Sequence, residues 1–172
     1  MKRHVVLIGL PGCGKTTVGR LVAEALHVGL VDIDAILARR EGKPIALIFA
    51  EKGEPAFREM ERKEMEATLG SQAAIVAPGG GWAAQSGAIE SARARALVVY
   101  LRARPEAAAQ HAAPEGTRPL LIGEDPVARM RQLLKEREPL YLKADAVVDT
   151  DRKTEQQVAA EVTRLAQSRA GW

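Results

Sequence analysis

The sequence predicts an α/β fold with a largely parallel sheet, and two observations carry this prediction. Short continuous apolar runs rich in β-branched residues, typical of strands buried on both faces, alternate with segments whose apolar residues recur at helical spacing. The chain of 172 residues is 47% apolar and 27% charged, which suits one compact domain over residues 1–172. The predicted strands are 4–9, 31–34, 73–77, 96–100 and 146–149.

Helical segments separate these strands. The Asp-Pro pair at 125–126 is typical of a helix start, Pro139 of a helix end, and Thr154 with Gln157 forms a capping-box signature before the last helix. Residues 112–124 have no periodicity, and long unpatterned loops of this kind are often lids. The predicted helices are 16–26, 35–40, 55–69, 105–111, 126–138 and one that follows Thr154.

Composition narrows the class of protein. Lys and Arg total 25 against 22 Asp and Glu, without a basic block, and the few aromatic residues are not clustered, so we expect no nucleic-acid partner. No apolar run approaches the roughly 18 residues of a membrane span, and the first one ends too early for a signal peptide. The single Cys13 fits a reducing compartment, which predicts a cytoplasmic protein. We interpret it as a small residue that fits its loop rather than as a redox-sensitive thiol.

The segment GLPGCGKTTVGR at 9–20 carries the most specific chemistry. It matches the pattern G-x-x-x-x-G-K-[ST] with Gly9, Gly14, Lys15 and Thr16, and it lies between a predicted strand and a predicted helix. In such a loop the backbone N–H groups and the helix N-terminus hold a phosphate chain, the lysine reaches the β- and γ-phosphates, and the hydroxyl binds Mg²⁺. The segment therefore predicts a nucleotide-binding loop.

Two carboxylates follow in the VDID segment. Asp32 and Asp34 are two residues apart at the end of the second predicted strand, where successive side chains alternate between faces. Asp34 could accept a proton from an alcohol while Asp32 holds water on Mg²⁺. The alternative is that both cap a turn.

Three other signals are weak when each is taken alone. Arg58 and Glu61 are close enough on a helix to form a surface ion pair, and Arg137 near a helix end could be a solvated charge. The glycines at 79–81 either bring backbone N–H groups close to a ligand or form a plain flexible turn.

Together, these pieces resemble the shikimate kinase family over nearly the whole chain. The matching pieces are GLPGCGKTTVGR, VDID, the FR of EPAFREME, the triple glycine after the third strand, TRPLL in the predicted lid and REPLY before the last strand. The resemblance implies a three-layer, doubly wound sheet of five parallel strands in the order 2-3-1-4-5. It also implies phosphorylation of the 3-hydroxyl of shikimate with ATP and Mg²⁺, by a monomer.

The resemblance also implies roles on the nucleotide side. Lys15 and Thr16 would serve ATP and Mg²⁺, Asp32 would bind the metal ion through water, and Arg118 would close with the lid over the γ-phosphate. Gln110-His111 stands where the family often has an arginine against adenine, which leaves Arg104 and Arg152 as candidates. The full set implied for the nucleotide is Gly12, Cys13, Gly14, Lys15, Thr16, Thr17, Arg118 and Arg152, with Thr16 and Asp32 for the metal.

On the acceptor side, the resemblance implies a pocket built from a helical segment at about 34–69. Asp34 would hold and deprotonate the substrate hydroxyl, so that Lys15, Asp34 and Arg118 are the expected catalytic residues. Arg58 and Arg137 would hold the shikimate carboxylate. The remaining members of the implied pocket are Phe49 and Phe57 as walls, Glu61 orienting the arginines, and backbone at Gly79, Gly80 and Gly81.

Trp82 departs from the small residue expected after the triple glycine, and we expect it to pack against the sheet rather than narrow the pocket. Two alternatives stay open. Another small-molecule kinase of the same fold, for gluconate or a nucleotide, would keep the phosphate loop but does not need the two arginines and the triple glycine together. A non-catalytic nucleotide-binding module would be expected to lose Asp34 or Arg118, and both are present.

Overall fold

A parallel sheet organises the molecule. The computed structural model describes residues 1–112 and 125–172. Its five strands are all parallel and lie in the order β2-β3-β1-β4-β5, as the resemblance implies. The strands are β1 (His4–Ile8), β2 (Leu30–Asp32), β3 (Ile75–Ala77), β4 (Ala96–Arg102) and β5 (Ala146–Asp149).

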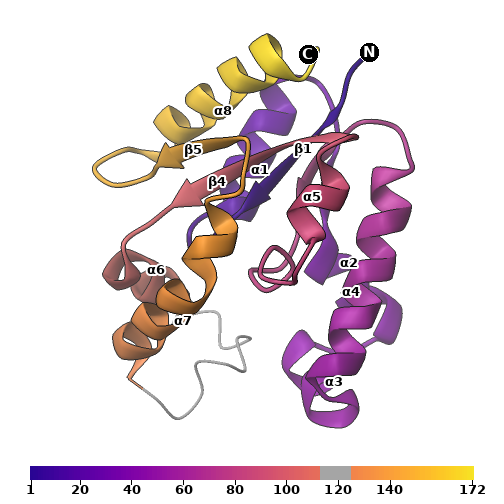
Figure 1. The fold of residues 1–172 in the computed structure, drawn as a ribbon, viewed down its shortest axis with the longest axis vertical. Coiled ribbons are helices and arrows are strands. Elements are labelled where there is room, and N and C mark those ends of the chain that lie inside the picture. Colours follow the sequence, from indigo (N-terminus) through magenta and orange to yellow (C-terminus); the bar gives the residue numbers. More distant parts are fainter. Residues whose placement is uncertain (113–124) are drawn as a thin grey trace.

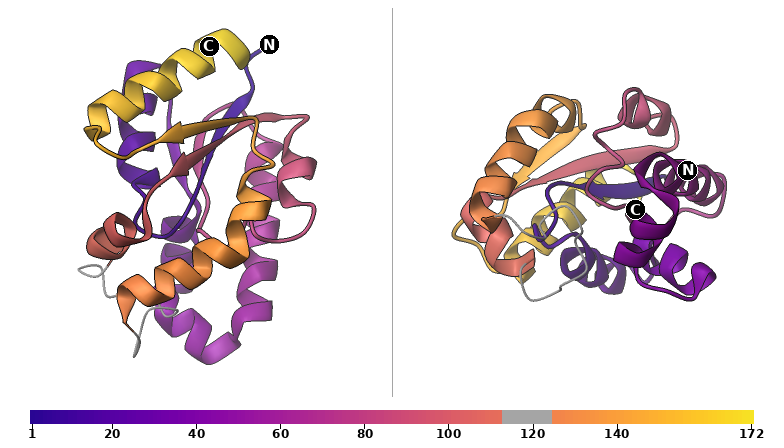
Figure 2. Two further views of the ribbon diagram at one scale, coloured as in Figure 1. Left: turned by 60° about the vertical axis from the view of Figure 1, so that its left-hand side comes forward. Right: turned by 90° about the horizontal axis from the view of Figure 1, so that it is seen from below.

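Helices cover both faces of the sheet. The amphipathic α1 and α8 lie together on one face, and α4, α5 and α7 lie on the other (Figure 1). Figure 2 shows the same three layers from two further directions. The helices of the described residues are α1 (Lys15–Ala25), α2 (Ile33–Glu41), α3 (Ile45–Lys52), α4 (Glu54–Leu69), α5 (Ala88–Ala92), α6 (Pro105–Ala112), α7 (Pro126–Tyr141) and α8 (Glu155–Arg169). None of these helices has the length and apolar character needed to cross a bilayer.

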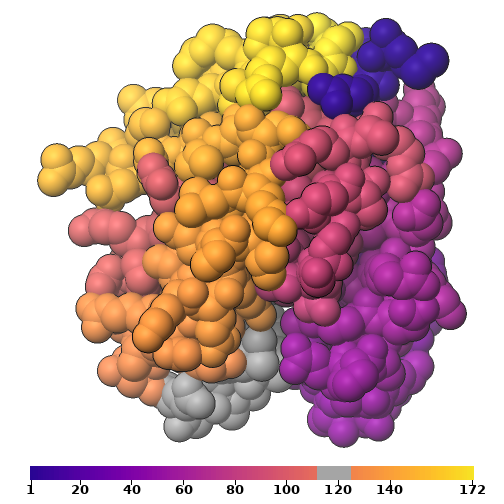
Figure 3. Space-filling view, in the orientation of Figure 1, coloured from indigo at the N-terminus to yellow at the C-terminus, as the bar shows by residue number. Residues whose placement is uncertain are grey.

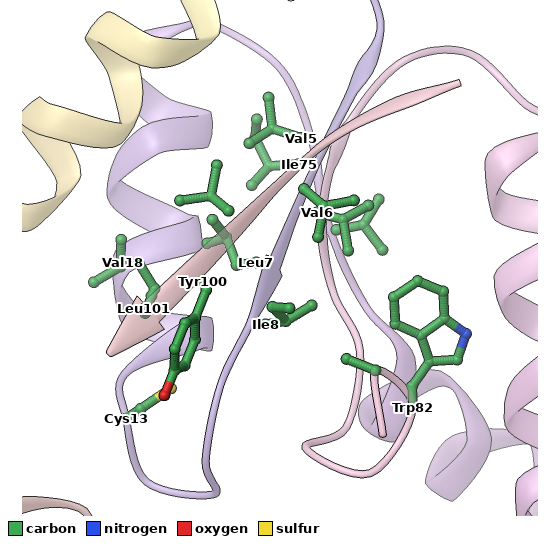
Figure 4. Packing of buried hydrophobic residues seen from close by; sticks show 14 of the residues in the cluster. Val5, Val6, Leu7, Ile8, Cys13, Val18, Ile75, Trp82, Tyr100 and Leu101 are labelled. Atoms are coloured by element: carbon green, nitrogen blue, oxygen red, sulfur yellow. The ribbon is translucent and has the colours of Figure 1, made fainter. Parts of the chain in front are cut away.

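The core lies along the central strands (Figure 4). All five residues of β1 are buried, because β3 and β4 pair with it on either side and helices cover both faces. The indole of Trp82 is 4% exposed and belongs to this core, which confirms the expectation that it packs against the sheet. The carboxyl ends of the parallel strands meet at one edge, where ligands bind in open α/β sheets.

Two predicted boundaries are wrong. The second strand ends at Asp32, which is the N-cap of α2 and accepts a hydrogen bond from Ala35 N at 3.1 Å. Asp34 therefore lies in the first turn of a helix, not in a strand. Pro139 does not end α7, which continues to Tyr141, since proline removes only one backbone donor and helical bonding resumes at Leu142 N.

Two short helices were not predicted from sequence periodicity, although one of them, α3, lies within the helical segment that the resemblance implied at about 34–69. The α3 segment IALIFAEK begins with consecutive apolar residues, so it has no amphipathic stripe to reveal a helix. Its ends are set by Pro44 as N-cap and by Gly53, which has a φ of 81°. The five-residue α5 is too short for any periodicity to be read.

Candidate active site

The phosphate loop joins β1 to α1. Gly9, Gly12 and Gly14 have φ angles of 149°, 78° and 96°, which L side chains rarely adopt, and α1 begins at Lys15 directly after Gly14. A Cβ atom at Gly9 would lie 2.6 Å from the carbonyl oxygen of Leu101 on β4, so the loop is pressed against the neighbouring strand. The helix N-terminus therefore faces the concave side of the loop, which suits a phosphate group.

Lys15 points back into this loop. Its ammonium is buried and donates hydrogen bonds to the carbonyl oxygens of Gly9 and Leu10, each at 2.9 Å. The loop carbonyls thus hold the charged group inside the phosphate loop.

Thr16 and Asp32 form the expected metal-binding pair. The Thr16 hydroxyl, in the first turn of α1, donates to Asp32 Oδ2 at the end of β2 at 3.0 Å. The two residues thus present a hydroxyl and a carboxylate oxygen beside the phosphate loop. Mg²⁺ prefers such oxygen ligands and commonly takes only one or two carboxylates, with phosphates and water completing its shell. The donor set therefore fits Mg²⁺.

A cavity of about 210 Å³ adjoins the outer side of the phosphate loop. Two arginines expected near the adenine, Arg104 and Arg152, both line it, and Arg104 pairs with Asp151 at 3.1 Å. His111 lines the same cavity. The loop residues in its wall are Gly12, Cys13 and Gly14.

Glycines 79–81 form the second half of the site. A Cβ atom at Gly79 would lie 2.7 Å from Glu61 Oε2 and 2.9 Å from Asp34 Oδ1. A Cβ atom at Gly81 would lie 2.6 Å from Arg58 Nη1. Because these glycines have no side chains, the charged groups of Asp34, Glu61 and Arg58 can pack directly against the backbone that follows β3.

Gly80 joins the two halves of the site. Its Cβ position lies 3.0 Å from Pro11 Cδ and 3.2 Å from the Gly9 carbonyl oxygen, both in the phosphate loop, and 3.3 Å from Arg137 Nη1 on α7. The space-filling view shows the segment between β3 and β4 lying between α7 and α4 on this face (Figure 3). At the triple glycine the backbone thus closely approaches the phosphate loop and charged side chains, which excludes the interpretation as a plain flexible turn.

Arg58 is held on three sides. Its Nη1 lies 3.0 Å from Glu61 Oε1, and its guanidinium lies over the rings of Phe57 and Phe49 at 5.5 and 5.6 Å. The two rings pack against each other with centroids 4.5 Å apart. The pair of Arg58 and Glu61 is therefore buried rather than a surface ion pair.

Glu61 has a strongly perturbed carboxyl group. Burial raises its pKa to about 7, Asp34 adds to that shift, and Arg58 and Arg137 oppose it. Among the described residues, its Oε2 atom has no hydrogen-bond partner. The group therefore titrates near neutral pH in the centre of the site.

Tyr141 is the site residue that the sequence did not indicate. Its hydroxyl is buried and donates to the carbonyl oxygen of Gly80 at 2.6 Å, with that of Gly9 at 3.3 Å. The REPLY segment contains both Arg137 and Tyr141. Because Pro139 is typical of a helix end, the sequence did not predict that Tyr141 follows Arg137 by one helical turn and shares its face.

Most of the expected site residues come together in two adjoining clusters. Gly12, Cys13, Gly14, Lys15, Thr16 and Thr17 lie in the loop and the start of α1, and Asp34, Phe49, Phe57, Arg58, Glu61, Gly79, Gly80, Gly81 and Arg137 lie around the triple glycine. Arg118 and residues 113–124 of the predicted lid lie outside the described residues. A nucleotide loop beside a cluster that contains a buried arginine, a second, largely buried arginine and two carboxylates is typical of a P-loop kinase with a small anionic acceptor.

The comparisons assign this kinase to a family. The family model described as shikimate kinase matches residues 11–167. A shikimate kinase of Mycobacterium avium is 43% identical over 154 residues, covering 89% of this chain and 87% of that protein. The chain therefore belongs to the shikimate kinase family, as the resemblance indicated, and it is a phosphotransferase.

Solved structures agree with this assignment. Shikimate kinase from Acinetobacter baumannii, determined in complex with shikimate, superimposes with a TM-score of 0.92 and 34% identity, covering 98% of this chain and 94% of that one. A gluconokinase from Sinorhizobium meliloti reaches a TM-score of 0.67 at 19% identity, over 99% of this chain and 94% of that one. The second likeness shows only that the fold is shared.

The raised pKa of Glu61 predicts a specific pH dependence of stability. Between its ordinary pKa of about 4.5 and its folded value of about 7, the folded protein holds a proton that the unfolded chain has released. The contribution of protonated Glu61 to the free energy of unfolding is therefore complete below about pH 4.5 and is lost as the pH rises through 7. Relative to wild type, Glu61→Gln should gain up to about 1.4 kcal/mol of unfolding free energy per pH unit between about pH 5 and 7.

Urea denaturation at a series of pH values measures this difference. Glu59→Gln is the matched control, because Glu59 lies on the same helix, is half exposed and has a lowered pKa through Arg62. A constant difference between Glu61→Gln and wild type over this range would contradict the assignment.

Proposed function

We propose that this chain transfers the γ-phosphoryl group of ATP to the 3-hydroxyl of shikimate in a site built entirely by one chain. The observation that carries this proposal is the triple glycine, which packs the acceptor pocket with Arg58 and Arg137 directly against the phosphate loop. Shikimate is a small anion with several hydroxyl groups. Its carboxylate requires fork-shaped cationic donors, and its hydroxyls require a carboxylate acceptor.

The nucleotide side is assigned to the loop and the start of α1. The backbone N–H groups of residues 12–17 hold the phosphates, and Lys15 leaves the loop carbonyls to contact the β- and γ-phosphates. The Thr16 hydroxyl and, through water, Asp32 would hold Mg²⁺, which when bound neutralises charge on the phosphate oxygens. The cavity lined by Arg104 and Arg152 is assigned to the adenosine. Arg118 is assigned to the γ-phosphate from the resemblance alone.

The acceptor side is assigned to α2, α4 and α7. Arg58 and Arg137 bind the carboxylate of shikimate, and Glu61 with the Phe49 and Phe57 rings keeps Arg58 in position. Asp34, whose Oδ1 lies against Gly79, accepts the proton of the attacking hydroxyl. Positioning and charge neutralisation then account for most of the rate, as is typical of phosphoryl transfer.

We also propose a monomeric, cytoplasmic enzyme. The two clusters of the described site come from a single chain, so no second copy is needed to complete them. The only cysteine, Cys13, is buried in the phosphate loop and cannot form an internal disulfide, which suits a reducing compartment.

The direct test is acceptor specificity. We expect ADP release from the purified protein with ATP and Mg²⁺ to require shikimate. Nucleoside monophosphates have no carboxylate for the arginines, whereas quinate and gluconate have both a carboxylate and hydroxyls but differ from shikimate in shape, so they test whether the site recognises the spacing of these groups. A coupled spectrophotometric assay would compare shikimate with quinate, gluconate, nucleoside monophosphates and no acceptor. Turnover with gluconate or a nucleotide in place of shikimate would refute the proposal.

Asp34→Asn should lower kcat by about 10²- to 10⁴-fold while ATP affinity changes little. The amide is close in size but cannot accept the hydroxyl proton, and removal of a general base typically costs this much. Steady-state kinetics and nucleotide titration measure the two effects. Near-normal turnover would rule out Asp34 as the base.

Arg58→Lys and Arg137→Lys should each raise the KM for shikimate by roughly 10- to 100-fold with little effect on the KM for ATP, since a lysine cannot reproduce the fork of hydrogen bonds to a carboxylate. Arg62→Lys is the matched control, because Arg62 lies one turn further along α4 but is exposed and pairs with Glu59. A parallel rise in both KM values would show that the arginines do not bind the carboxylate.

A further inference from the structure

Tyr141 touches both halves of the site, and the Arg137 guanidinium also interacts with its hydroxyl oxygen, which opposes the rise in its pKa. Tyr141 is the last residue of α7, fully buried, and its hydroxyl lies 2.6 Å from the Gly80 carbonyl oxygen and 3.3 Å from that of Gly9. The first carbonyl belongs to the segment that packs against the acceptor-binding groups. The second belongs to the phosphate loop.

The hydroxyl has one proton, so it donates fully to only one of these carbonyls. The distances assign that proton to Gly80 in the present state. Gly9 then depends on Lys15, whose ammonium donates to the same carbonyl at 2.9 Å. The Gly9 oxygen is thus shared between a lysine assigned to the nucleotide and a tyrosine bonded to the acceptor segment.

Nucleotide binding changes this balance. When Lys15 turns to the phosphates, the buried Gly9 carbonyl loses its charged donor, and a buried acceptor without a donor is costly. Tyr141 already lies within hydrogen-bond reach of that oxygen. A shift of its proton towards Gly9 weakens the bond to Gly80, whose Cβ position lies 3.3 Å from Arg137 Nη1.

The ring of Tyr141 is fixed, so the hydroxyl can change partner without a large movement of the side chain. Tyr100 packs against it with centroids 5.1 Å apart, and the Tyr100 hydroxyl donates to Glu138 Oε2 at 2.6 Å. Burial raises the pKa of Tyr141 to about 12, so the hydroxyl keeps its proton at neutral pH.

We propose that Tyr141 is a positioning residue that couples the two binding sites through its shared hydrogen bond to Gly9 and Gly80. The proposal rests on the assignment of Lys15 to the nucleotide and of the triple-glycine pocket to shikimate. Coupling of this kind is reciprocal, so each ligand must change the affinity for the other by the same factor.

Tyr141→Phe tests the proposal, since it removes only the hydroxyl. Isothermal titration would give the Kd of shikimate with and without a saturating non-hydrolysable ATP analogue and Mg²⁺, and the Kd of the analogue with and without shikimate. In the wild type we expect the same factor from both titrations, within the 5- to 150-fold range typical of coupled sites. In Tyr141→Phe we expect this factor to fall towards 1.

Tyr100→Phe is the matched control, because it removes the neighbouring buried hydroxyl, which bonds to Glu138 and not to the two loops. It should keep the wild-type factor. An unchanged factor in Tyr141→Phe, an equal loss in Tyr100→Phe, or a wild-type factor of 1 would each overturn the proposal. If the wild type turns over shikimate in the acceptor assay but shows no coupling in these titrations, the coupling proposal is wrong and the proposed function stands. If the wild type does not turn over shikimate, the proposed function is wrong.

A second measurement needs no variant at the site. The chain has two tyrosines, so ¹³Cζ-tyrosine labelling gives two NMR signals, which Tyr100→Phe assigns. The nucleotide analogue alone should shift the Tyr141 signal more than the Tyr100 signal, because the hydroxyl of Tyr141 changes its acceptor. A Tyr141 signal that does not respond to the analogue would overturn the proposal even if Tyr141→Phe fails to fold.

Discussion

The close approach of the segment after β3 to the phosphate loop is the constraint on which the rest of the site depends. Gly80 lies against Pro11 and the Gly9 carbonyl, and this close packing is favoured by the absence of a side chain. A methyl group there would meet these atoms at 3.0 and 3.2 Å, tighter than most real contacts, and the loop would have to move. If the two clusters hold nucleotide and acceptor as proposed, this approach would set the distance between them, and phosphoryl transfer is highly sensitive to that distance.

One helix supplies two of the contacts to Gly80 at this approach. Along the last turn of α7, Arg137 faces Gly80 and Tyr141 donates to its carbonyl oxygen. The i, i+4 spacing puts Arg137 and Tyr141 on one face of the helix. Pro139 between them is tolerated because the helix needs to give up only one backbone hydrogen bond. Arg137 and Tyr141 in the last turn of α7 therefore contact the same glycine, and a change in either residue is expected to affect the other.

The sequence predicted those parts of the molecule that depend on local patterns. The phosphate loop needs fixed spacing between Gly9 and Thr16, and the buried strands need continuous apolar runs, so both are visible in one chain. The pocket could be assembled only through the resemblance, because the approach of Arg58 to Gly81 joins residues far apart in sequence. Spacing alone left Asp34 in a strand and Tyr141 beyond a helix end, since neither the N-cap at Asp32 nor the buried carbonyl partners of Tyr141 have a local signal.

The buried charges around the triple glycine favour positioning over stability. A buried ion pair such as Arg58 with Glu61 recovers little more than the cost of its own desolvation. Its value lies in geometry: carboxylate oxygens of Glu54 and Glu61 and two aromatic faces surround the guanidinium of Arg58, so the side chain has little conformational freedom. The raised pKa of Glu61 is a consequence of this arrangement. Burial removes water from its carboxylate and the neighbouring Asp34 carboxylate repels it, and both effects disfavour the charged form. The guanidinium of Arg58 is thus held in place by contacts within the chain itself.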